Sequence, residues 1–262
     1  MNRFAVCYNP NILHSKEVKD DLLKILLEKG ISAKTISIDN LESDFDFVFV
    51  IGGDGTILKT ARFFAKFGIP IFGINHGRLG FLSQSSKDNL KNAVDEIVSG
   101  NFVIDNRIML QSGEYYALND FVVKGCDTGR TSKFSLKING KFVCEYLADG
   151  IIISTPTGST AYGLSAGGPV LTPTLNAFVI VPICPHTLTA RPIVVPDTEV
   201  ITICSDKTAI MSADGQETYE FGNEINIQKS DYNAQLALLN NCEFYSILRE
   251  KLNWSTHPKY FN

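Results

Sequence analysis

The chain has 262 residues, 44% of them hydrophobic and 20% charged, which is enough for one large domain or two ordinary ones. Its net charge of −4 provides no positive field toward nucleic acid or anionic lipid, and ordinary Gly and Pro contents (20 and 10 residues) exclude collagen-like and low-complexity chains. We therefore expect a globular protein without nucleic-acid or membrane partners, in which any phosphate ligand is held by local groups.

The cysteines and the apolar runs indicate the cellular compartment. The six cysteines are spaced too irregularly for CxxC pairs or a disulfide framework, so we expect reduced, mostly buried thiols. The first ten residues have too few apolar positions for a signal sequence, and the longest apolar runs, 47–51 and 178–183, fall far below the ~18 residues that a membrane helix needs. The sequence therefore predicts a cytoplasmic protein.

Residues 1–100 alternate short apolar runs with amphipathic stretches, which predicts a doubly wound α/β domain with a parallel sheet. Gly30, Gly68 and Gly100 each follow a helical stretch and favour its termination there. The expected strands are 4–8, 33–38, 47–51 and 69–74, and the expected helices are 15–29, 56–67 and 88–98.

After about residue 102 the pattern changes to short alternating segments with a turn about every 8 to 12 residues, which is typical of an all-β domain. Within it, 134–138 and 141–144 flank Asn139-Gly140, the dipeptide that a type I′ hairpin turn favours. Helical spacing returns at 243–252, where we expect a helix that packs back on the first domain. The predicted divisions are an α/β domain at 1–100, a β-rich domain at 101–240, and a helix with tail at 241–262.

The first candidate site is the glycine-rich turn Gly52-Gly53-Asp54-Gly55-Thr56, between an apolar strand and an amphipathic helix. In doubly wound sheets, ligands bind at the carboxyl ends of strands, where glycines permit close approach and a helix N-terminus attracts phosphate. The spacing matches neither a Walker loop nor the GxGxxG fingerprint. Because a carboxylate repels phosphate, Asp54 should bind a divalent metal or accept a hydroxyl proton, unless it only caps the helix through an Asx turn.

A second candidate is the hydroxyl-rich loop TPTGSTAY at 155–162, which follows an apolar strand. Its hydroxyls could form a polar cup, and Tyr162 offers a flat ring and a phenol to a purine or sugar; an ordinary Ser/Thr turn is the alternative. The next residues, Gly163-Leu-Ser165-Ala-Gly167, match the GxSxG elbow of hydrolases. Ser165 does not follow a strand directly, His186 precedes the later acids and His257 lies in a polar tail, so the hydrolase interpretation is disfavoured.

Two acidic pairs and several basic residues complete the candidates. Asn119-Asp120 and Asp149-Gly150 each place a carboxylate at a turn, and an amide beside a carboxylate can hold both hydroxyls of a ribose, although such dipeptides are common in ordinary turns. The basic residues near the glycine-rich turn are Lys59, Arg62, His76 and Arg78. Some could face phosphate, but for Lys59 and Arg62 on the helix a solvated surface is the better explanation.

Taken together, these motifs resemble the NAD kinase family. The resemblance rests on GGDGT at 52–56, Asn119-Asp120, Asp149-Gly150, TPTGSTAY at 155–162, SAGGP at 165–169 and LREKLNW at 248–254, in the family's order. GGDGT is shared with lipid and sugar kinases, whereas TPTGSTAY with SAGGP is specific. The resemblance implies a Rossmann-like N-terminal domain, a β-rich NAD-binding C-terminal domain, and ATP-dependent phosphorylation of the 2′-hydroxyl of the adenosine ribose of NAD, with Mg²⁺ or Mn²⁺.

By this resemblance Asp54 is the general base for that hydroxyl, and Gly55 shapes its turn. Asn119 and Asp120 match the pair that holds NAD; the family often has Glu at the second position, so Asp120 is one methylene shorter. The remaining candidate contacts, from the resemblance or from the two loops, are Lys59, Phe81, Asp149, Thr157, Thr160, Ala161, Tyr162, Ser165 and Gln216. Tyr162 is expected near the adenine, and the resemblance implies a homodimer or homotetramer.

Two other functions stay open at the level of sequence. One is a lipid or sugar kinase that uses the same glycine-rich turn, and the other is a nucleotide-binding regulator without chemistry. The sequence does not decide the metal ligands, the use of polyphosphate or other triphosphates as donor, the acceptance of NADH, or the effectors.

Overall fold

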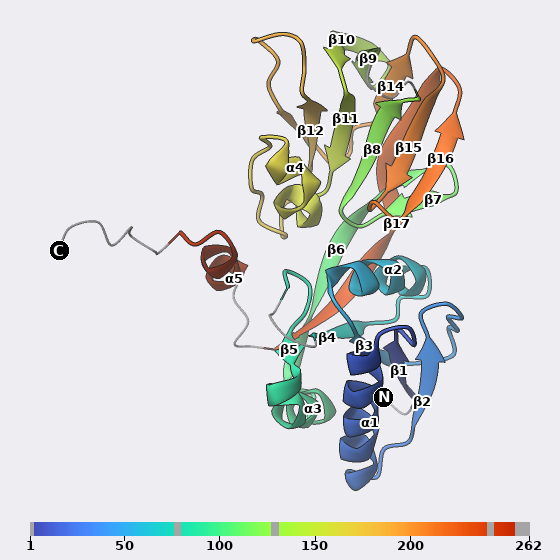
Figure 1. Cartoon of the computed structure of the whole chain (residues 1–262), viewed down its shortest axis with the longest axis vertical. Coiled ribbons are helices and arrows are strands. Elements are labelled where there is room, and N and C mark those ends of the chain that lie inside the picture. The colour runs from blue at the N-terminus through green and yellow to red at the C-terminus, as the bar shows by residue number, and fades with distance from the viewer. Residues whose placement is uncertain (1–2, 76–79, 127–130, 240–243, 255–262) are drawn as a thin grey trace, which may run out of the picture. The chain divides into compact units, whose positions relative to one another are not determined.

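The structure, a computed structural model, describes residues 3–75, 80–126, 131–239 and 244–254 (Figure 1). The chain forms two compact units. One contains the residues up to Asn106 together with those from Gln235 onward, and the other is Arg107–Ala234. The chain leaves the first unit within strand β6 (Phe102–Ser112) and returns within strand β17 (Glu224–Leu239).

The first unit is built on a parallel sheet, as predicted. Its strands run in the order β2-β1-β3-β4, and each neighbouring pair is parallel. β4 also pairs with β5 and, through Ile71 and Leu236, with the end of β17. The bounds are β1 Phe4–Tyr8, β2 Ala33–Ser37, β3 Phe47–Ile51, β4 Ile71–Asn75 and β5 Ser85–Ser86.

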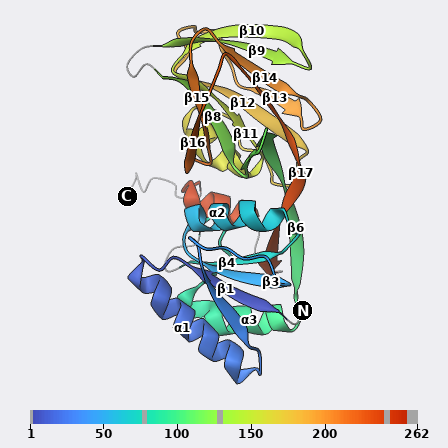
Figure 2. The same ribbon diagram turned by 90° about the vertical axis from the view of Figure 1, so that its right-hand side faces the viewer.

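Helices cover both faces of this sheet (Figure 2). The helices are α1 Leu13–Glu28, α2 Asp54–Ala65 and α3 Leu90–Val98, and a short 3-10 helix, η1 Lys87–Asn89, precedes α3. Phe47, Phe49 and Ile51 of β3 pack with α1 and α3 in one apolar core, while α2 covers the opposite face. Because successive strand residues point to opposite faces, a strand covered on both sides must be apolar throughout. All five residues of β3 are fully buried.

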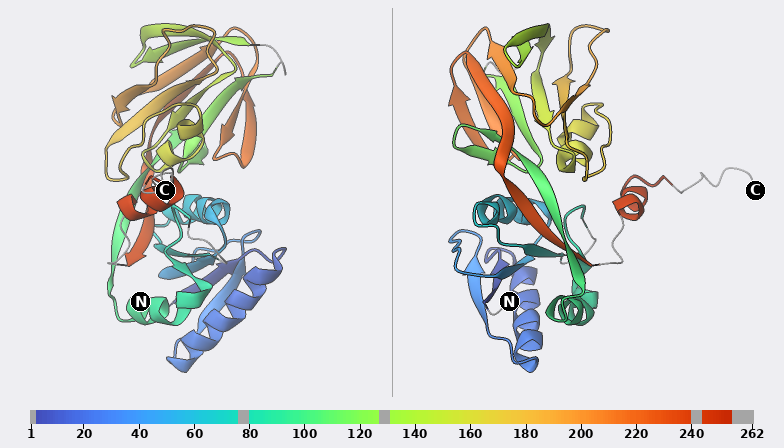
Figure 3. Two further views of the ribbon diagram at one scale, coloured as in Figure 1. Left: turned by 60° about the vertical axis from the view of Figure 1, so that its left-hand side comes forward. Right: turned by 180° about the vertical axis from the view of Figure 1, so that it is seen from behind.

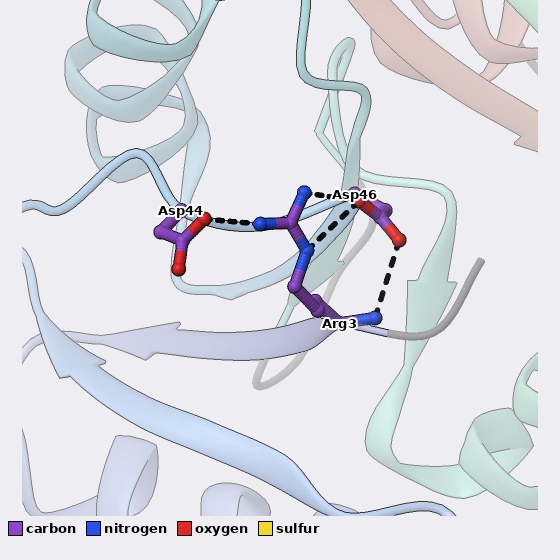
Figure 4. A network of polar contacts seen from close by, with 3 residues as sticks. All are labelled: Arg3, Asp44 and Asp46. Carbon is purple, nitrogen blue, oxygen red and sulfur yellow. Dashed lines mark hydrogen bonds and ion pairs between the residues drawn. The ribbon is translucent and has the colours of Figure 1, made fainter.

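An ion-pair network ties the start of β1 to the segment before β3 (Figure 4). The Arg3 guanidinium donates to the carboxylates of Asp44 and Asp46, with Nη2 2.8 Å from Asp46 Oδ1. The Asp46 N–H donates to the Arg3 carbonyl at 2.8 Å. Since the Arg3 side chain is largely exposed, these ion pairs add little stability, and the backbone pairing of β1 with β3 holds the two strands together.

The second unit is an antiparallel β-sandwich (Figure 3). One sheet has the order β13-β12-β11-β8-β15-β16, the other contains β10-β9-β14-β17, and β6 pairs with β17 and β7. Phe121, Phe134 and Phe178 lie in the apolar core between the sheets. The bounds are β7 Tyr115–Ala117, β8 Asp120–Gly125, β9 Ser132–Ile138, β10 Lys141–Ala148, β11 Gly150–Ser154, β12 Ala177–Ile183, β13 Ile193–Pro196, β14 Ile201–Ser205, β15 Ala209–Ala213 and β16 Glu217–Phe221.

The predicted hairpin is confirmed. β9 and β10 pair antiparallel around Asn139 and Gly140, whose φ angles of 49° and 74° are those of a type I′ turn. Beyond the end of β11, the chain forms η2 (Thr157–Thr160) and α4 (Tyr162–Ser165), which lie against the outer face of the six-stranded sheet. This outer face carries the candidate site of the second unit.

The last helix, α5 (Phe244–Lys251), falls within the predicted 243–252, and its residues belong to the first unit. The expectation of mostly buried thiols is wrong. Of the five described cysteines, all of them free, Cys7 is buried, whereas Cys126 and Cys184 are exposed because they follow the ends of β8 and β12. Cys242 lies outside the described residues. In the described part of the chain, none of the helices has the length and apolar character needed to span a membrane.

Candidate functional site

The glycine-rich turn lies at the carboxyl end of β3, where the sequence predicted a ligand site. Gly53 is extended (φ −79°, ψ 179°) and is the N-cap of α2, so Asp54 is the first residue of that helix. Gly52 must lack a side chain, because a Cβ there would lie 2.5 Å from the Thr56 side chain. The turn therefore brings the chain from a buried strand directly into a helix N-terminus.

The Asp54 carboxylate reaches away from its own helix. Its Oδ2 accepts the N–H of Phe81 at 3.0 Å, and its Oδ1 accepts the N–H of Leu82 at 3.3 Å. Both donors follow β4, the neighbouring strand, so the carboxylate bridges the exits of two parallel strands. This arrangement differs from the Asx-turn alternative. An ionised carboxylate has about four acceptor positions, which leaves room for a further partner.

Gly80 provides the space for that carboxylate. A Cβ at Gly80 would lie 2.0 Å from Asp54 Oδ1, and the Gly80 N–H donates to Ser83 Oγ at 2.6 Å. Gly80 is a site residue that the sequence alone did not predict. The only signal was a glycine directly before Phe81.

The other candidates of the first unit have different surroundings. Lys59 is half-buried, with Nζ 3.5 Å from Asp39 Oδ1, Gly55 is exposed and Phe81 is half-buried. Arg62 is buried, so its assignment to the solvated surface is wrong: its side chain lies within the packed part of α2. His76 and Arg78 lie outside the described residues.

The second unit contains a pocket of about 500 Å³ on the outer face of its six-stranded sheet. Alternate residues of β8 and β15 form its floor, because every second residue of a strand points to the same face. The lining residues are Asn119, Asp120, Val122, Lys124, Ala161, Tyr162, Ile210, Ser212, Asp214, Gly215 and Thr218. Four predicted contacts therefore lie together here: Asn119, Asp120, Ala161 and Tyr162.

Strand pairing explains why these distant motifs meet. β11 pairs antiparallel with β8, with Ser154 opposite Asp120, so the hydroxyl-rich loop starts beside Asn119. The Thr155 N–H donates to the Asn119 carbonyl at 2.9 Å. Gly158 packs against the same carbonyl, since a Cβ there would lie 2.1 Å from the Asn119 oxygen.

The hydroxyls of this loop are mostly used inside the protein. Thr155, Thr157 and Ser159 are buried. Thr157 Oγ1 accepts a hydrogen bond from Arg107 at 3.2 Å, and Ser159 Oγ donates to the Pro156 carbonyl at 2.7 Å. These hydroxyls therefore hold the loop in shape, which is the structural alternative that the sequence left open.

The remaining predicted contacts lie away from the pocket lining. Thr160 Oγ1 donates to the Thr157 carbonyl at 3.3 Å. Asp149, Ser165 and Gln216 are exposed, at the start of β11, at the end of α4 and in the turn before β16.

Two electrostatic features distinguish the pocket. Asp120 is only 4% exposed, and burial together with the nearby Asp214 charge raises the pKa of Asp120 to about 7. At the opposite end of β8, Lys124 Nζ lies 5.5 Å from the centre of the Tyr162 ring, within the range of a cation–π contact. One end of the pocket floor thus has a carboxyl group with a pKa of about 7, and the other end has a cation on an aromatic face.

The described residues contain no cluster of three or more His, Cys, Asp or Glu side chains that could form a metal cage. A Mg²⁺ ion bound to nucleotide phosphates commonly needs only one or two protein carboxylates. The Asp54 carboxylate, which keeps acceptor positions beyond its two N–H partners, fits that smaller requirement.

Comparisons with known proteins cover both units. The model described as the ATP-NAD kinase N-terminal domain matches residues 8–102, and the one described as the ATP-NAD kinase C-terminal domain matches residues 118–239. The NAD kinase of Carboxydothermus hydrogenoformans is 43% identical over 82% of this chain and 82% of its own. The NAD kinase of Clostridium botulinum (strain Loch Maree) is 38% identical over 97% of each chain.

Solved structures agree with these matches. An NAD kinase from Archaeoglobus fulgidus, crystallised in complex with ATP, superimposes with a TM-score of 0.82 at 31% identity over 96% of this chain and 98% of that one. Yeast NADH kinase complexed with NADH gives a TM-score of 0.86 over 100% of this chain and 90% of its own, and its 22% identity shows a shared fold.

Asp120 should make the protein less stable as the pH rises from about 4 to about 7. Because its pKa is raised in the folded state, Asp120 there holds a proton that the unfolded chain has already lost. The free energy of unfolding then falls by at most about 1.4 kcal/mol per pH unit across this window. Asp120→Asn removes this dependence. The free energy of unfolding of the variant should therefore rise relative to that of wild type from pH 4 to 7, and the difference should stay constant above pH 8.

Denaturant unfolding of the ligand-free chain between pH 4 and 8.5 measures this difference. Asp231→Asn, at an exposed position of β17, is the matched control and should follow wild type at every pH. A difference between Asp120→Asn and wild type that stays constant with pH would contradict the raised pKa.

Proposed function

The chain belongs to the ATP-NAD kinase family, and from this premise we propose that Asp54 is the general base and that Asn119 and Asp120 hold the ribose. The chain phosphorylates NAD at the 2′-hydroxyl of its adenosine ribose, with ATP as the phosphoryl donor, and produces NADP. One observation carries the assignment of Asp54: its carboxylate, at the end of a central strand, is held by N–H groups of the next strand exit and not by its own helix. The match to the ATP-NAD kinase C-terminal domain favours an NAD kinase over a lipid or sugar kinase and over a regulator without chemistry.

The proposed base addresses the main chemical difficulty of the reaction. A secondary ribose hydroxyl is a poor nucleophile near pH 7, and a carboxylate that accepts its proton as the phosphorus–oxygen bond forms contributes roughly 10² to 10⁴ in rate. The N–H groups of Phe81 and Leu82 fix the orientation of the Asp54 carboxylate. Orientation matters because phosphoryl transfer depends on alignment of the attacking and leaving oxygens more than on covalent chemistry.

The pocket of the second unit supplies the groups that NAD needs. The Asn119 amide and the Asp120 carboxyl offer donors and acceptors to a ribose diol. Tyr162, 39% exposed, offers a ring for stacking of the adenine, and Val122 and Ile210 give the floor an apolar part. The family resemblance alone supports the further contacts proposed for Gly55, Phe81, Asp149, Thr160, Ser165 and Gln216. Lys59 and Thr157 are proposed from their places near the glycine-rich turn and in the hydroxyl-rich loop.

Three further properties belong to the proposal. Mg²⁺ or Mn²⁺ would be held by Asp54 together with the triphosphate, where it would neutralise charge on the transferred group. A cytoplasmic location is supported by the free thiols of the five described cysteines. A homodimer or homotetramer is supported by the family resemblance.

Asp54→Asn should reduce NADP formation by at least ~10², with folding and NAD binding retained, because the amide is nearly isosteric but cannot accept the hydroxyl proton. The assay is NADP production from ATP, Mg²⁺ and NAD, with NAD affinity measured separately by calorimetry. Asp20→Asn, an exposed carboxylate on α1, is the control. Turnover near the wild-type value in Asp54→Asn would remove Asp54 from the role of base.

Gly80→Ala should lower turnover about tenfold or more, although it changes no reactive group. The added methyl would lie 2.0 Å from Asp54 Oδ1 and must displace the carboxylate. Gly222→Ala is the matched control, since no atom lies within 4 Å of its Cβ position and it should retain activity. If Gly80→Ala keeps full turnover, the placement of the carboxylate seen here is not the one that the reaction uses.

Tyr162→Ala should weaken NAD binding more than ATP binding, since a stacked base contributes ~1 to 3 kcal/mol by analogy with nucleic-acid recognition. Tyr162→Phe keeps the ring and should retain most of the NAD affinity. Calorimetric titration with each nucleotide provides the comparison. Equal losses for NAD and ATP in Tyr162→Ala would count against stacking on this ring.

A further inference from the structure

The turn between β15 and β16 presents a carboxylate to which the reaction scheme above gives no role. Asp214 directly follows β15 in the left-handed conformation (φ 51°), and Gly215 continues the turn (φ 66°). In the sequence this is an ordinary Asp-Gly turn dipeptide. In the structure Asp214 lines the same pocket as Asn119 and Asp120.

The Asp214 carboxylate accepts three successive backbone N–H groups. Its Oδ1 accepts those of Asn119 at 2.7 Å and Asp120 at 3.2 Å, and its Oδ2 accepts that of Leu118 at 3.1 Å. In return, the Asp214 N–H donates to the Asp120 carbonyl at 3.0 Å. One side chain, 95 positions from Asn119, therefore organises the whole segment that enters β8.

The hydroxyl-rich loop holds the same segment through its carbonyls. Thr155 Oγ1 donates to the Leu118 carbonyl at 2.6 Å, and the Thr155 N–H donates to the Asn119 carbonyl at 2.9 Å. With the bonds of Asp214, all three N–H groups and all three carbonyls of residues 118–120 have partners. A backbone with every polar group engaged has little freedom to rotate, so the directions of the Asn119 and Asp120 side chains are set by these two neighbours.

We propose that Asp214 is a positioning residue for ribose recognition: by holding three N–H groups it sets how Asn119 and Asp120 face the sugar of NAD. The inference rests on the function proposed above for that pair. A carboxylate suits this task because one side chain can accept several N–H bonds, and charge-assisted bonds are about twice as strong as neutral ones. An amide at position 214 could offer only its oxygen as an acceptor, and its NH₂ group would face an N–H donor.

The charge of Asp214 also affects Asp120 itself. Burial contributes most to the raised pKa of Asp120, and the negative charge of Asp214 adds to it. The other titratable groups that line the pocket are Lys124 on β8 and Tyr162 at the start of α4. Removal of the Asp214 charge should therefore lower the pKa of Asp120. This effect needs only the charge of Asp214 close to Asp120, so the pH dependence of binding reports whether the two carboxyl groups are neighbours.

The test is the NAD affinity of Asp214→Asn, measured by calorimetry without ATP between pH 5.5 and 8.5, so that the proposed base Asp54 is not involved. Ionised Asp120 accepts hydrogen bonds from the ribose, so wild-type affinity should fall as the pH drops through about 7. In Asp214→Asn we expect affinity about tenfold lower at pH 8, a midpoint of the pH dependence moved to lower pH, and unchanged ATP binding.

Asp206→Asn is a matched control. Asp206, between β14 and β15, likewise accepts a backbone N–H from another strand, that of Lys133 at 3.3 Å, but it does not line the pocket. It should leave NAD affinity and its pH midpoint unchanged. Asp214→Glu serves as a second variant if Asp214→Asn does not fold. It keeps the charge but moves the carboxylate by one methylene, so affinity should fall while the midpoint stays near that of wild type.

Two results would overturn the proposal: wild-type NAD affinity in Asp214→Asn, or a loss of affinity with an unmoved pH midpoint, which would mean that the Asp214 charge does not lie beside Asp120. For Asp214→Glu, wild-type affinity would overturn it. If Asp120→Asn and Tyr162→Ala also bind NAD like wild type, the assignment of the pocket fails and the inference fails with it. A failure confined to the Asp214 variants overturns the inference alone.

Discussion

The polar backbone groups at the ends of the strands impose the constraint on which both candidate sites depend. Where a strand ends, its N–H groups lose their ladder partners and need acceptors. In each unit a carboxylate from another strand exit meets this need: Asp54 accepts two N–H groups after β4, and Asp214 accepts three where the chain enters β8. Because ligands of doubly wound sheets bind at the carboxyl ends of strands, the bonds that complete the first unit also place the Asp54 carboxylate at the edge where such ligands bind.

Glycines make these close approaches possible. Gly80 lies against the Asp54 carboxylate, Gly52 against Thr56, and Gly158 against the Asn119 carbonyl, each closer than a Cβ would allow. None of these three has a positive φ, so the requirement is for space and not for an unusual backbone conformation. These three glycines therefore let the two strand exits pack closely against the groups named above, and this role does not require a bound ligand.

The hydroxyl-rich loop shows how a functional signature can consist largely of structural bonds. Its length and its composition suggested a cup of hydroxyls around a ligand, yet Thr155, Thr157 and Ser159 are buried and bonded to other parts of the same unit. The residues of this loop that line the pocket are the apolar Ala161 and the aromatic Tyr162. The loop thus presents an exposed aromatic ring on a rigid support, and Asn119, Asp120 and Asp214 bring polar groups to the same pocket.

The sequence by itself determined the α/β unit, the β-rich unit, the hairpin at Asn139-Gly140 and the family, because periodicity, turn residues and contiguous motifs are local properties. It could not determine that Arg62 is buried, that most of the described thiols are accessible, or that Asp54 bonds to the strand exit near Phe81. The structure alone decided which motif residues share a pocket and that Asp214 holds Asn119 and Asp120. These relations depend on how β8, β11 and β15 pair, across separations of up to 96 residues, and no local pattern encodes such a pairing.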